Sequence, residues 1–335
     1  MDREPSERAD VCVVGAGPAG ALVASQLASD GQTVVVLEAG PRFDRSNREQ
    51  QMEAAIRPGD HGSVWGMGGD RDAFTTSGER YYPLNVSRVK GVGGSTLHWQ
   101  GMVMRLHPSD FDGSHDTDDP AWPISYDDLR PYYADAERAL GVAGDADNPF
   151  APPRDGAYPL PGFPPSYSDS LFADACRRLG VTMHSVPNAR NSEPYDGRGP
   201  CVGYGTCQPV CPSGAKYDAS VHIEDAETEG ARVIDRVPVQ RLETDAEGRV
   251  EAAVYATPDG TEHRQAAREF VVAAGGVETP RLLLLSASED HPDGLANGSG
   301  LVGHYFMDHL FAGTGGTLDR ETRQNHVGFL TSECH

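Results

Sequence analysis

A glycine motif near the N-terminus constrains the fold of this chain more than any other feature of the sequence. Gly15, Gly17 and Gly20 form a G-x-G-x-x-G pattern that follows the apolar run Val11–Val14 and precedes apolar residues at helical spacing. A second apolar run then ends at the acidic Glu38. In a βαβ unit such glycines permit a tight turn, a close approach to a pyrophosphate and close helix–strand packing, while the acidic residue accepts hydrogen bonds from a ribose. The motif therefore predicts an α/β protein with a Rossmann-like dinucleotide-binding domain, and by itself it does not separate NAD from FAD.

The strand pattern returns in the second half of the chain, which predicts that this domain is discontinuous. Turn residues divide the apolar segments Val239–Thr244, Val250–Ala256 and Thr261–Gln265, and Phe270–Ala274 is a further buried strand that precedes a helical stretch. The region between the two halves is rich in Gly, Pro and Asp and contains one clear helical stretch, Tyr126–Leu140. We expect residues 8–105 and 215–312 to form the dinucleotide-binding domain, and residues 106–214 and 313–335 to form an α+β substrate or cap region that is incomplete at its C-terminal end.

The charge balance argues against nucleic acid as a partner. Asp and Glu number 50 against 28 Lys and Arg, which gives a formal charge of −22, and phosphate backbones repel such a chain. Only two of the basic residues are lysines, Lys90 and Lys216. This composition indicates a halophilic protein whose self-repulsion is screened by salt, although a GC-rich genome that favours Arg codons gives a similar bias. No apolar run is long enough to cross a bilayer, so we expect no transmembrane segment.

Three of the six cysteines lie within eleven positions, which indicates a metal site rather than a disulfide scaffold. Cys201, Cys207 and Cys211 stand on a loop rich in Gly and Pro, and Pro212 follows the third cysteine, as is common at iron–sulfur sites. Three thiolates favour a [3Fe–4S] cluster, because a four-iron cubane and a closed zinc site usually need four ligands. Zinc and the absence of any metal remain alternatives, and Cys176 is either a fourth ligand or a buried core thiol.

Four blocks of the sequence resemble the glucose–methanol–choline (GMC) family of FAD-dependent oxidoreductases. Together with the glycine motif they extend to residue 309, so the resemblance covers nearly the whole chain. The spacing of the three cysteines is similar to that of the cluster loop in catalytic subunits of bacterial FAD-dependent glucose dehydrogenases. The resemblance implies that the dinucleotide is FAD. The blocks are Gly91–Trp99, Trp122–Tyr126, Ala274–Pro280 and Gly303–His309.

The resemblance also implies which residues bind the cofactor. The N-terminal glycine motif would hold the ADP half of FAD, and the loop Gly93-Gly94-Ser95 would lie near the flavin. His98 occupies the position at which some family members carry a covalent histidyl–flavin bond, and we favour a histidine that packs beside the ring. The expected cofactor-binding residues are Gly15, Gly17, Gly20, Glu38, Gly93, Gly94, Ser95, His98 and Gly275, and the expected metal ligands are Cys201, Cys207 and Cys211.

The activity implied by the resemblance is oxidation of a CH–OH group in a sugar, a polyol or another alcohol. Hydride would pass to flavin N5, and the electrons would then leave through the cluster to a cytochrome or a quinone. A small subunit and a cytochrome subunit are therefore the expected partners. A cytoplasmic location is the default because no signal peptide is visible, but export or membrane association with a partner subunit stays open.

The end of the chain departs from the family pattern. In the family the catalytic base is a histidine near the C-terminus, paired with an Asn or His, and neither His326 nor His335 lies in such a motif. We therefore assign no catalytic residue, expect His304, Asp308 and His309 to be structural, and expect a C-terminally truncated chain. Three alternatives remain: an inactive remnant that binds FAD without turnover, an NAD-dependent dehydrogenase, and a zinc-stabilised binding module.

Overall fold

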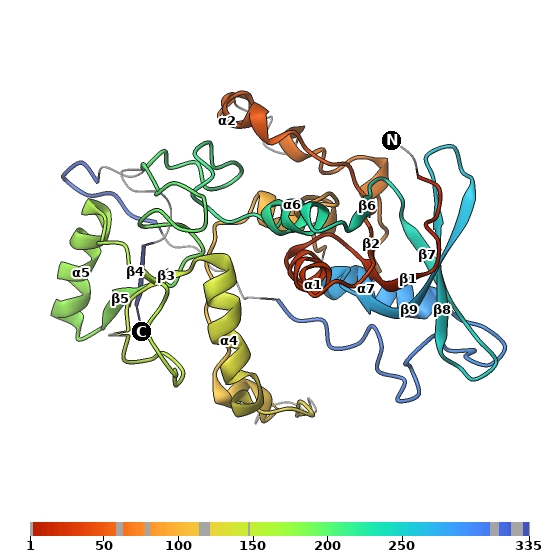
Figure 1. Cartoon of the computed structure of the whole chain (residues 1–335). Coiled ribbons are helices and arrows are strands. Elements are labelled where there is room, and N and C mark those ends of the chain that lie inside the picture. Colours follow the sequence, from red (N-terminus) through yellow and green to blue (C-terminus); the bar gives the residue numbers. More distant parts are fainter. Residues whose placement is uncertain are drawn as a thin grey trace. The chain divides into compact units, whose positions relative to one another are not determined.

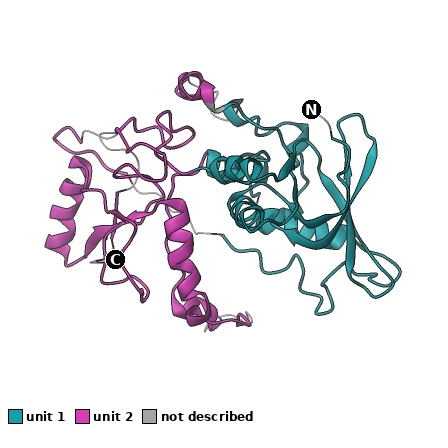
Figure 2. Ribbon diagram, in the orientation of Figure 1, with its two compact units in different colours: residues 1–45, 62–97, 218–310 teal, residues 46–61, 98–217, 311–335 magenta. Residues whose placement is uncertain are grey.

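The computed structural model describes residues 3–57, 63–77, 81–113, 121–146, 148–308, 315–322 and 331–334. The chain divides into two units, each made of separate segments of the sequence (Figure 2). Unit 1 contains residues 1–45, 62–97 and 218–310, and unit 2 contains residues 46–61, 98–217 and 311–335. The predicted domain boundaries at 105/106, 214/215 and 312/313 stay a prediction.

A six-stranded sheet forms the centre of unit 1 (Figure 1). Its strand order is β6-β2-β1-β9-β8-β7, in which the first four strands run parallel and β8 and β7 follow as an antiparallel meander. Strands from residues 9–37 and from residues 232–272 thus share one sheet, and the predicted α/β fold with a Rossmann-like parallel sheet is confirmed. The strands are β1 (Ala9–Val14), β2 (Val34–Leu37), β6 (Arg232–Ile234), β7 (Val239–Thr244), β8 (Val250–Ala256) and β9 (Glu262–Val272).

Strand β9 joins the parallel and antiparallel parts of this sheet. The sequence predicted two strands here, Thr261–Gln265 and Phe270–Ala274, but the structure has one strand of 11 residues. Its first half pairs with β8 and its second half pairs with β1. The polar pair Arg268 and Glu269 is exposed and lies inside the strand. Because neighbouring strand residues point to opposite faces of a sheet, solvent reaches both faces of β9 at this point. The two polar residues were therefore not the end of a strand, and the prediction of two separate strands was wrong.

Three helices pack on the elements of this sheet. Helix α1 (Pro18–Ser29) packs with α6 (Ser220–Thr228), and α7 (Gly275–Leu285) packs with β7. The residue before α1 is Gly17, which has no side chain to cap the first backbone amides of the helix. Those amides are therefore available to an external anion, and Pro18 at the first position fixes a helical φ.

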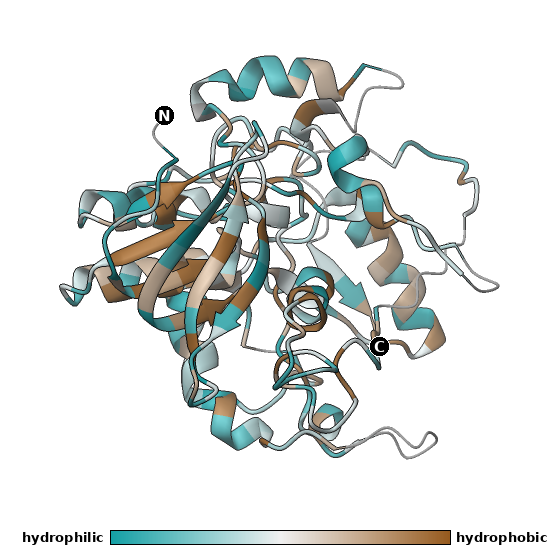
Figure 3. Ribbon diagram, turned by 90° about the vertical axis from the view of Figure 1, so that its right-hand side faces the viewer, coloured by the Kyte–Doolittle hydropathy of each residue, from teal (hydrophilic) through white to brown (hydrophobic). Residues whose placement is uncertain are grey.

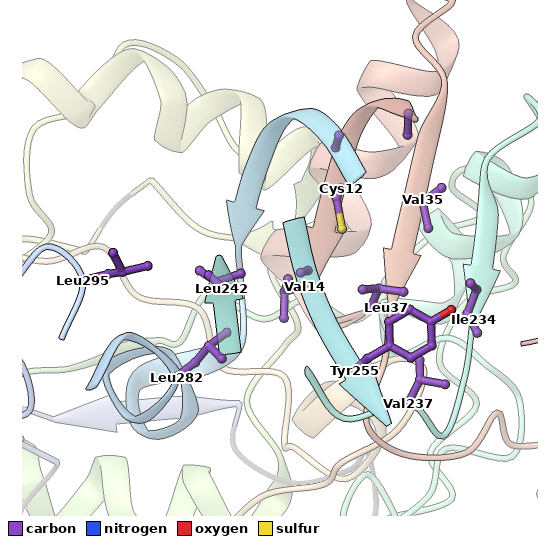
Figure 4. Packing of buried hydrophobic residues seen from close by; sticks show 13 residues of the cluster. Cys12, Val14, Val35, Leu37, Ile234, Val237, Leu242, Tyr255, Leu282 and Leu295 are labelled. Atoms are coloured by element: carbon purple, nitrogen blue, oxygen red, sulfur yellow. The ribbon is translucent and has the colours of Figure 1, made fainter. Parts of the chain in front are cut away.

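Apolar side chains from the sheet and from α7 form the core of unit 1 (Figure 4). In Figure 3 the hydrophobic colour gathers on strands of the large sheet. Cys12 is fully buried in this core, and burial raises the pKa of its thiol to about 12, so it is a packing residue rather than a reactive one. The labelled members of the cluster are Cys12, Val14, Val35, Leu37, Ile234, Val237, Leu242, Tyr255, Leu282 and Leu295.

Unit 2 contains helices and two small sheets. The helix predicted at Tyr126–Leu140 is confirmed as α4, and a second long helix, α5, spans Tyr167–Leu179. Among the described residues, no helix combines the length and the apolar character needed to cross a membrane. The remaining elements are α2 (Arg48–Ala55), β3 (Ala143–Gly144) paired with β4 (Leu160–Pro161), and β5 (Met183–Ser185) paired with β10 (Ser332–Cys334).

A buried ion cluster ties α4 to the chain segments beside it in unit 2. The Glu137 carboxylate accepts hydrogen bonds from Arg105 Nε at 2.8 Å and from Arg154 Nη1 at 2.9 Å. None of these three side chains is more than 10% exposed. Burial alone would raise the pKa of Glu137, but hydrogen bonds and charges of the two guanidinium groups outweigh burial and lower it. The interior of unit 2 therefore contains one carboxylate held by two cations.

Candidate cofactor site

A cavity of about 710 Å³ lies in unit 1, where the glycine motif meets the start of α7. Pockets that bind small molecules and cofactors span about 300–1,000 Å³. Gly20 and Gly93 pack against the backbone of the glycine loop and do not line this cavity, and His98 belongs to unit 2. The predicted residues that line it come from four stretches of sequence and are Gly15, Gly17, Glu38, Gly94, Ser95 and Gly275.

The three motif glycines have different surroundings. A Cβ atom at Gly15 would lie 2.6 Å from Ala273 O, and the φ of Gly15 is +104°. A Cβ at Gly20 would lie 2.0 Å from Gly15 O. A Cβ at Gly17 would have no atom within 4 Å. The fold itself therefore requires glycine at 15 and 20, whereas Gly17 leaves free space beside the backbone, as a bound pyrophosphate needs.

Glu38 is buried at the end of β2, and its carboxylate braces the glycine loop. Its Oε2 accepts a hydrogen bond from Ala16 N at 2.8 Å, and its Oε1 accepts one from Gly40 N at 2.8 Å. Burial raises the pKa of this carboxyl, against the effect of the two hydrogen bonds. Each carboxylate oxygen has a second acceptor site, so the predicted contact with a ribose hydroxyl stays a prediction. The sequence did not indicate the bracing role.

The second glycine-rich loop forms another wall of the cavity. Gly93 N donates a hydrogen bond to Ala16 O at 2.9 Å, which joins this loop to the first one. A Cβ at Gly94 would lie 2.9 Å from Gly17 Cα. Gly93 and Gly94 have φ values of +105° and +56°. Only glycine combines this backbone conformation with such a close approach, which explains the paired glycines in the sequence.

Three cationic side chains of the cavity wall surround one carboxylate, and we call them, with that carboxylate, the Glu278 cluster. Glu278 lies in the first turn of α7, at 2.9 Å from Arg88 Nη2, 3.3 Å from Lys90 Nζ and 3.2 Å from Arg281 Nη1. Burial alone would raise the pKa of Glu278, but the three cations lower it. The cluster has three cations and one carboxylate, but Lys90 Nζ also lies 3.7 Å from Asp72 Oδ1, and the cavity wall includes the carboxylates of Glu38 and Asp308. Within this wall the three cations are the groups that would attract a bound anion such as a pyrophosphate. The sequence did not indicate this cluster, and Lys90 stood out there only as one of two lysines.

His98 makes its described contacts within unit 2. Burial, together with the charge of Lys216, lowers the pKa of His98 to about 4, so its imidazole is neutral at pH 7. Lys216 Nζ donates a hydrogen bond to Trp99 O at 2.7 Å, and Trp99 Nε1 donates one to Tyr217 O at 2.8 Å. These bonds fix the backbone next to His98. Its predicted place beside a flavin ring, with or without a covalent bond, stays a prediction.

The three clustered cysteines lie on one loop of unit 2, and all three are free thiols. Arg190 Nη1 donates a hydrogen bond to Cys207 Sγ at 3.5 Å, and Lys216 N donates one to Cys211 Sγ at 3.5 Å. Cys207 and Cys211 are buried and Cys201 is half-buried. Within the described ranges, no three His, Cys, Asp or Glu side chains are arranged to hold a metal ion. The donor set has the chemistry for an iron–sulfur cluster, and burial, together with the charges of Cys207 and Cys211, raises the pKa of the Cys201 thiol.

The remaining residues named in the sequence analysis are the histidines and Asp308 near the C-terminal end. His304 is exposed, and the Asp308 carboxylate accepts a hydrogen bond from the Tyr82 hydroxyl, which raises the pKa of Tyr82. Tyr82 and Asp308 both line the cavity. His309, His326 and His335 lie outside the described residues.

Known proteins are similar to this chain in sequence and in fold. A profile described as GMC oxidoreductase matches residues 162–311, and one described as NAD(P)-binding Rossmann-like domain matches residues 13–55. The fructose dehydrogenase large subunit of Gluconobacter japonicus is 38% identical over 328 residues, which cover 90% of this chain and 58% of that protein. The 2-methyl-1,2-propanediol dehydrogenase of Mycolicibacterium austroafricanum is 34% identical over 319 residues, which cover 91% and 56%.

A solved structure has a similar fold. A formate oxidase variant of Aspergillus oryzae RIB40, solved to study the modification of its FAD, has a TM-score of 0.55 at 20% identity, and the match covers 86% of this chain and 48% of that one. At this level of identity the likeness concerns the fold alone.

The parallel sheet, with a glycine loop between β1 and α1, defines a Rossmann-like dinucleotide-binding protein. The chain belongs to the GMC oxidoreductase family, as the sequence motifs predicted. It spans 58% and 56% of the lengths of the two dehydrogenases above.

Proposed function

We propose that this chain is the FAD-binding part of a GMC dehydrogenase that oxidises a CH–OH group of a sugar, a polyol or another alcohol. The observation that carries the proposal is the cavity of about 710 Å³, whose wall combines the open space at Gly17, the backbone of Gly94 and the Glu278 cluster. The dehydrogenase relatives named for fructose and for 2-methyl-1,2-propanediol support a sugar or diol as the substrate class.

In this proposal the chain's own residues bind and orient the cofactor. The first amides of α1 and the cations Arg88 and Lys90 neutralise the pyrophosphate, and Glu38 accepts from the ribose through its remaining lone pairs. Bound FAD supplies the acceptor for the hydride that leaves the substrate carbon. The catalytic base is not assigned to any described residue.

Anaerobic mixing with candidate substrates tests this proposal. The chain loaded with FAD is mixed with fructose, glucose, sorbitol and 1,2-propanediol, and acetate serves as the control because none of its carbons carries both a hydrogen and a hydroxyl group. We expect at least one alcohol to bleach the oxidised flavin absorption and then to reduce an added dye. Bound FAD that no alcohol reduces would contradict turnover by this chain and favour the alternative of a remnant that binds FAD without turnover, and failure to bind FAD would contradict the whole proposal.

We also propose that Cys201, Cys207 and Cys211 take an iron–sulfur cluster of the [3Fe–4S] type, which passes electrons to a cytochrome or quinone with the help of a small subunit. Three free thiols on one loop, two of them hydrogen-bonded by Arg190 and the Lys216 backbone, support this assignment. Anaerobic purification is expected to yield iron and acid-labile sulfide in the ratio of that formula, and zinc or no metal would contradict it.

Salt is predicted to stabilise the folded chain, because its formal charge is −22. Raising the NaCl concentration from about 0.1 M to about 1 M shortens the Debye length from about 10 Å to about 3 Å and weakens the self-repulsion. We expect the thermal unfolding midpoint to rise by several degrees in circular dichroism, and to rise less with a neutral osmolyte of equal osmolality. A midpoint that stays flat or falls with salt would contradict the halophilic interpretation.

A further inference from the structure

Two cysteines outside the cysteine loop lie together in unit 2. Cys176 is in the last turns of α5, and Cys334 is the last residue of β10. Both are free, and Cys334 is exposed while Cys176 is half-buried. Burial, followed by the charge and hydrogen bonding of Cys176, raises the pKa of the Cys334 thiol. The proposed cofactor site uses neither residue.

The path of the chain explains why these cysteines meet. Gly180, with a φ of +74°, ends α5, and Val181 N donates a hydrogen bond to Cys176 O at 2.9 Å, so the chain turns back beside Cys176. Strand β5 follows, and β10 pairs with it antiparallel, with Cys334 opposite Met183. Figure 1 shows α5, β5 and the C-terminal end of the chain in the same part of unit 2. The end of β10 is thus brought to the end of α5.

A second contact fixes the alignment of β10 along α5. Thr331 Oγ1 donates a hydrogen bond to the Asp169 carboxylate in the first turn of α5, where Asp169 also accepts from Ser166 N. Seven residues of helix separate Asp169 from Cys176, a rise of about 10.5 Å. Three residues of extended chain separate Thr331 from Cys334, about 10 Å. Because these lengths agree, the contact at Thr331 sets Cys334 beside Cys176.

We propose that Cys176 and Cys334 form a disulfide bond under oxidising conditions, which ties β10 to α5. An external disulfide such as oxidised glutathione is the oxidant. The thiolate of one cysteine attacks it to form a mixed disulfide, the other thiolate displaces the bound glutathione, and two glutathione thiols leave with the two protons. The exposure of Cys334 gives the oxidant access to the pair. The same pairing removes Cys176 as a fourth cluster ligand.

Mass spectrometry of the unaltered chain tests this proposal. After incubation with oxidised glutathione, the chain is unfolded in denaturant and alkylated without reductant. Two of the six cysteines are then expected to escape alkylation, and digestion should release a linked Cys176–Cys334 peptide. A Cys334→Ser chain should lose the linked peptide, and a Cys201→Ser chain should keep it.

The oxidised chain is also expected to unfold several degrees above the reduced chain, because the bond closes a long loop in the unfolded state. This difference should disappear in Cys334→Ser. Full alkylation of Cys176 after oxidation, or a bond between Cys176 and a cysteine of the 201–211 loop, would overturn the proposal. The linked peptide and the change in unfolding temperature can both be measured whether or not the chain binds FAD or iron.

Discussion

A chain with Gly17→Val is expected to fold like the parent chain and to bind FAD at least about a hundredfold more weakly, a loss of about 2.8 kcal/mol. A Cβ at this position meets no atom within 4 Å, and the φ of −77° suits any residue, so the fold tolerates the substitution. The valine side chain would instead fill the space beside the first amides of α1, where a pyrophosphate has to approach. Flavin fluorescence titration measures the affinity, and thermal unfolding measures the stability.

Two other glycines provide the controls for this experiment. Gly156→Val introduces the same side chain at a position in unit 2 that also has no atom within 4 Å, and we expect it to change neither affinity nor stability. Gly20→Ala places a Cβ 2.0 Å from Gly15 O and is expected to destabilise unit 1 by about 3 kcal/mol or more. Parent-like FAD affinity in Gly17→Val would contradict the assignment of the pyrophosphate to this cavity.

The second large effect is expected in unit 2, where Glu137→Leu should lower the free energy of unfolding by about 3–5 kcal/mol. Without the carboxylate, the buried guanidinium groups of Arg105 and Arg154 lose their shared anion. Urea unfolding followed by circular dichroism measures the change. Asp135→Asn on the same helix is the matched control, since its ion pair with Arg138 is 59% exposed on the Asp135 side, and it should change stability by at most about 0.5 kcal/mol.

The pH dependence of this effect has a definite sign. Because the pKa of Glu137 is lowered in the folded chain, its contribution is present above the ordinary glutamate pKa of 4.5 and is lost as the pH falls through the folded value. The stability difference between the parent chain and Glu137→Leu should therefore shrink on acidification. A difference that is constant across that range, or smaller than that of the Asp135→Asn control, would contradict the account of the cluster.

The parts of the fold that follow from local rules could be predicted from the sequence. The glycine motif had to lie between a buried strand and a helix, because only glycine accepts the φ of Gly15 and the contact at Gly20, and it does so. The helix α4 and the strands β2, β7 and β8 lie where the apolar periodicity placed them. The family likewise followed from motifs whose residues are close in sequence.

Features that depend on tertiary contacts could not be predicted. The Glu278 cluster joins residues 88, 90, 278 and 281, and the Cys176–Cys334 contact joins α5 to a strand more than 150 residues later, so neither leaves a local pattern. The arrangement of the cysteine loop is also set by its surroundings. Spacing identified three donors, but the hydrogen bonds from Arg190 and Lys216 that orient two of the sulfurs come from outside the motif.

The nucleotide retained by the purified chain tests the central claim most directly. The chain is loaded with a mixture of FAD and NAD, washed free of unbound nucleotide and denatured in acid, and the released nucleotide is identified by chromatography. The account predicts about one FAD per chain, little NAD, and a large loss of FAD in Gly17→Val. Release of NAD in place of FAD, or of neither nucleotide, would contradict it.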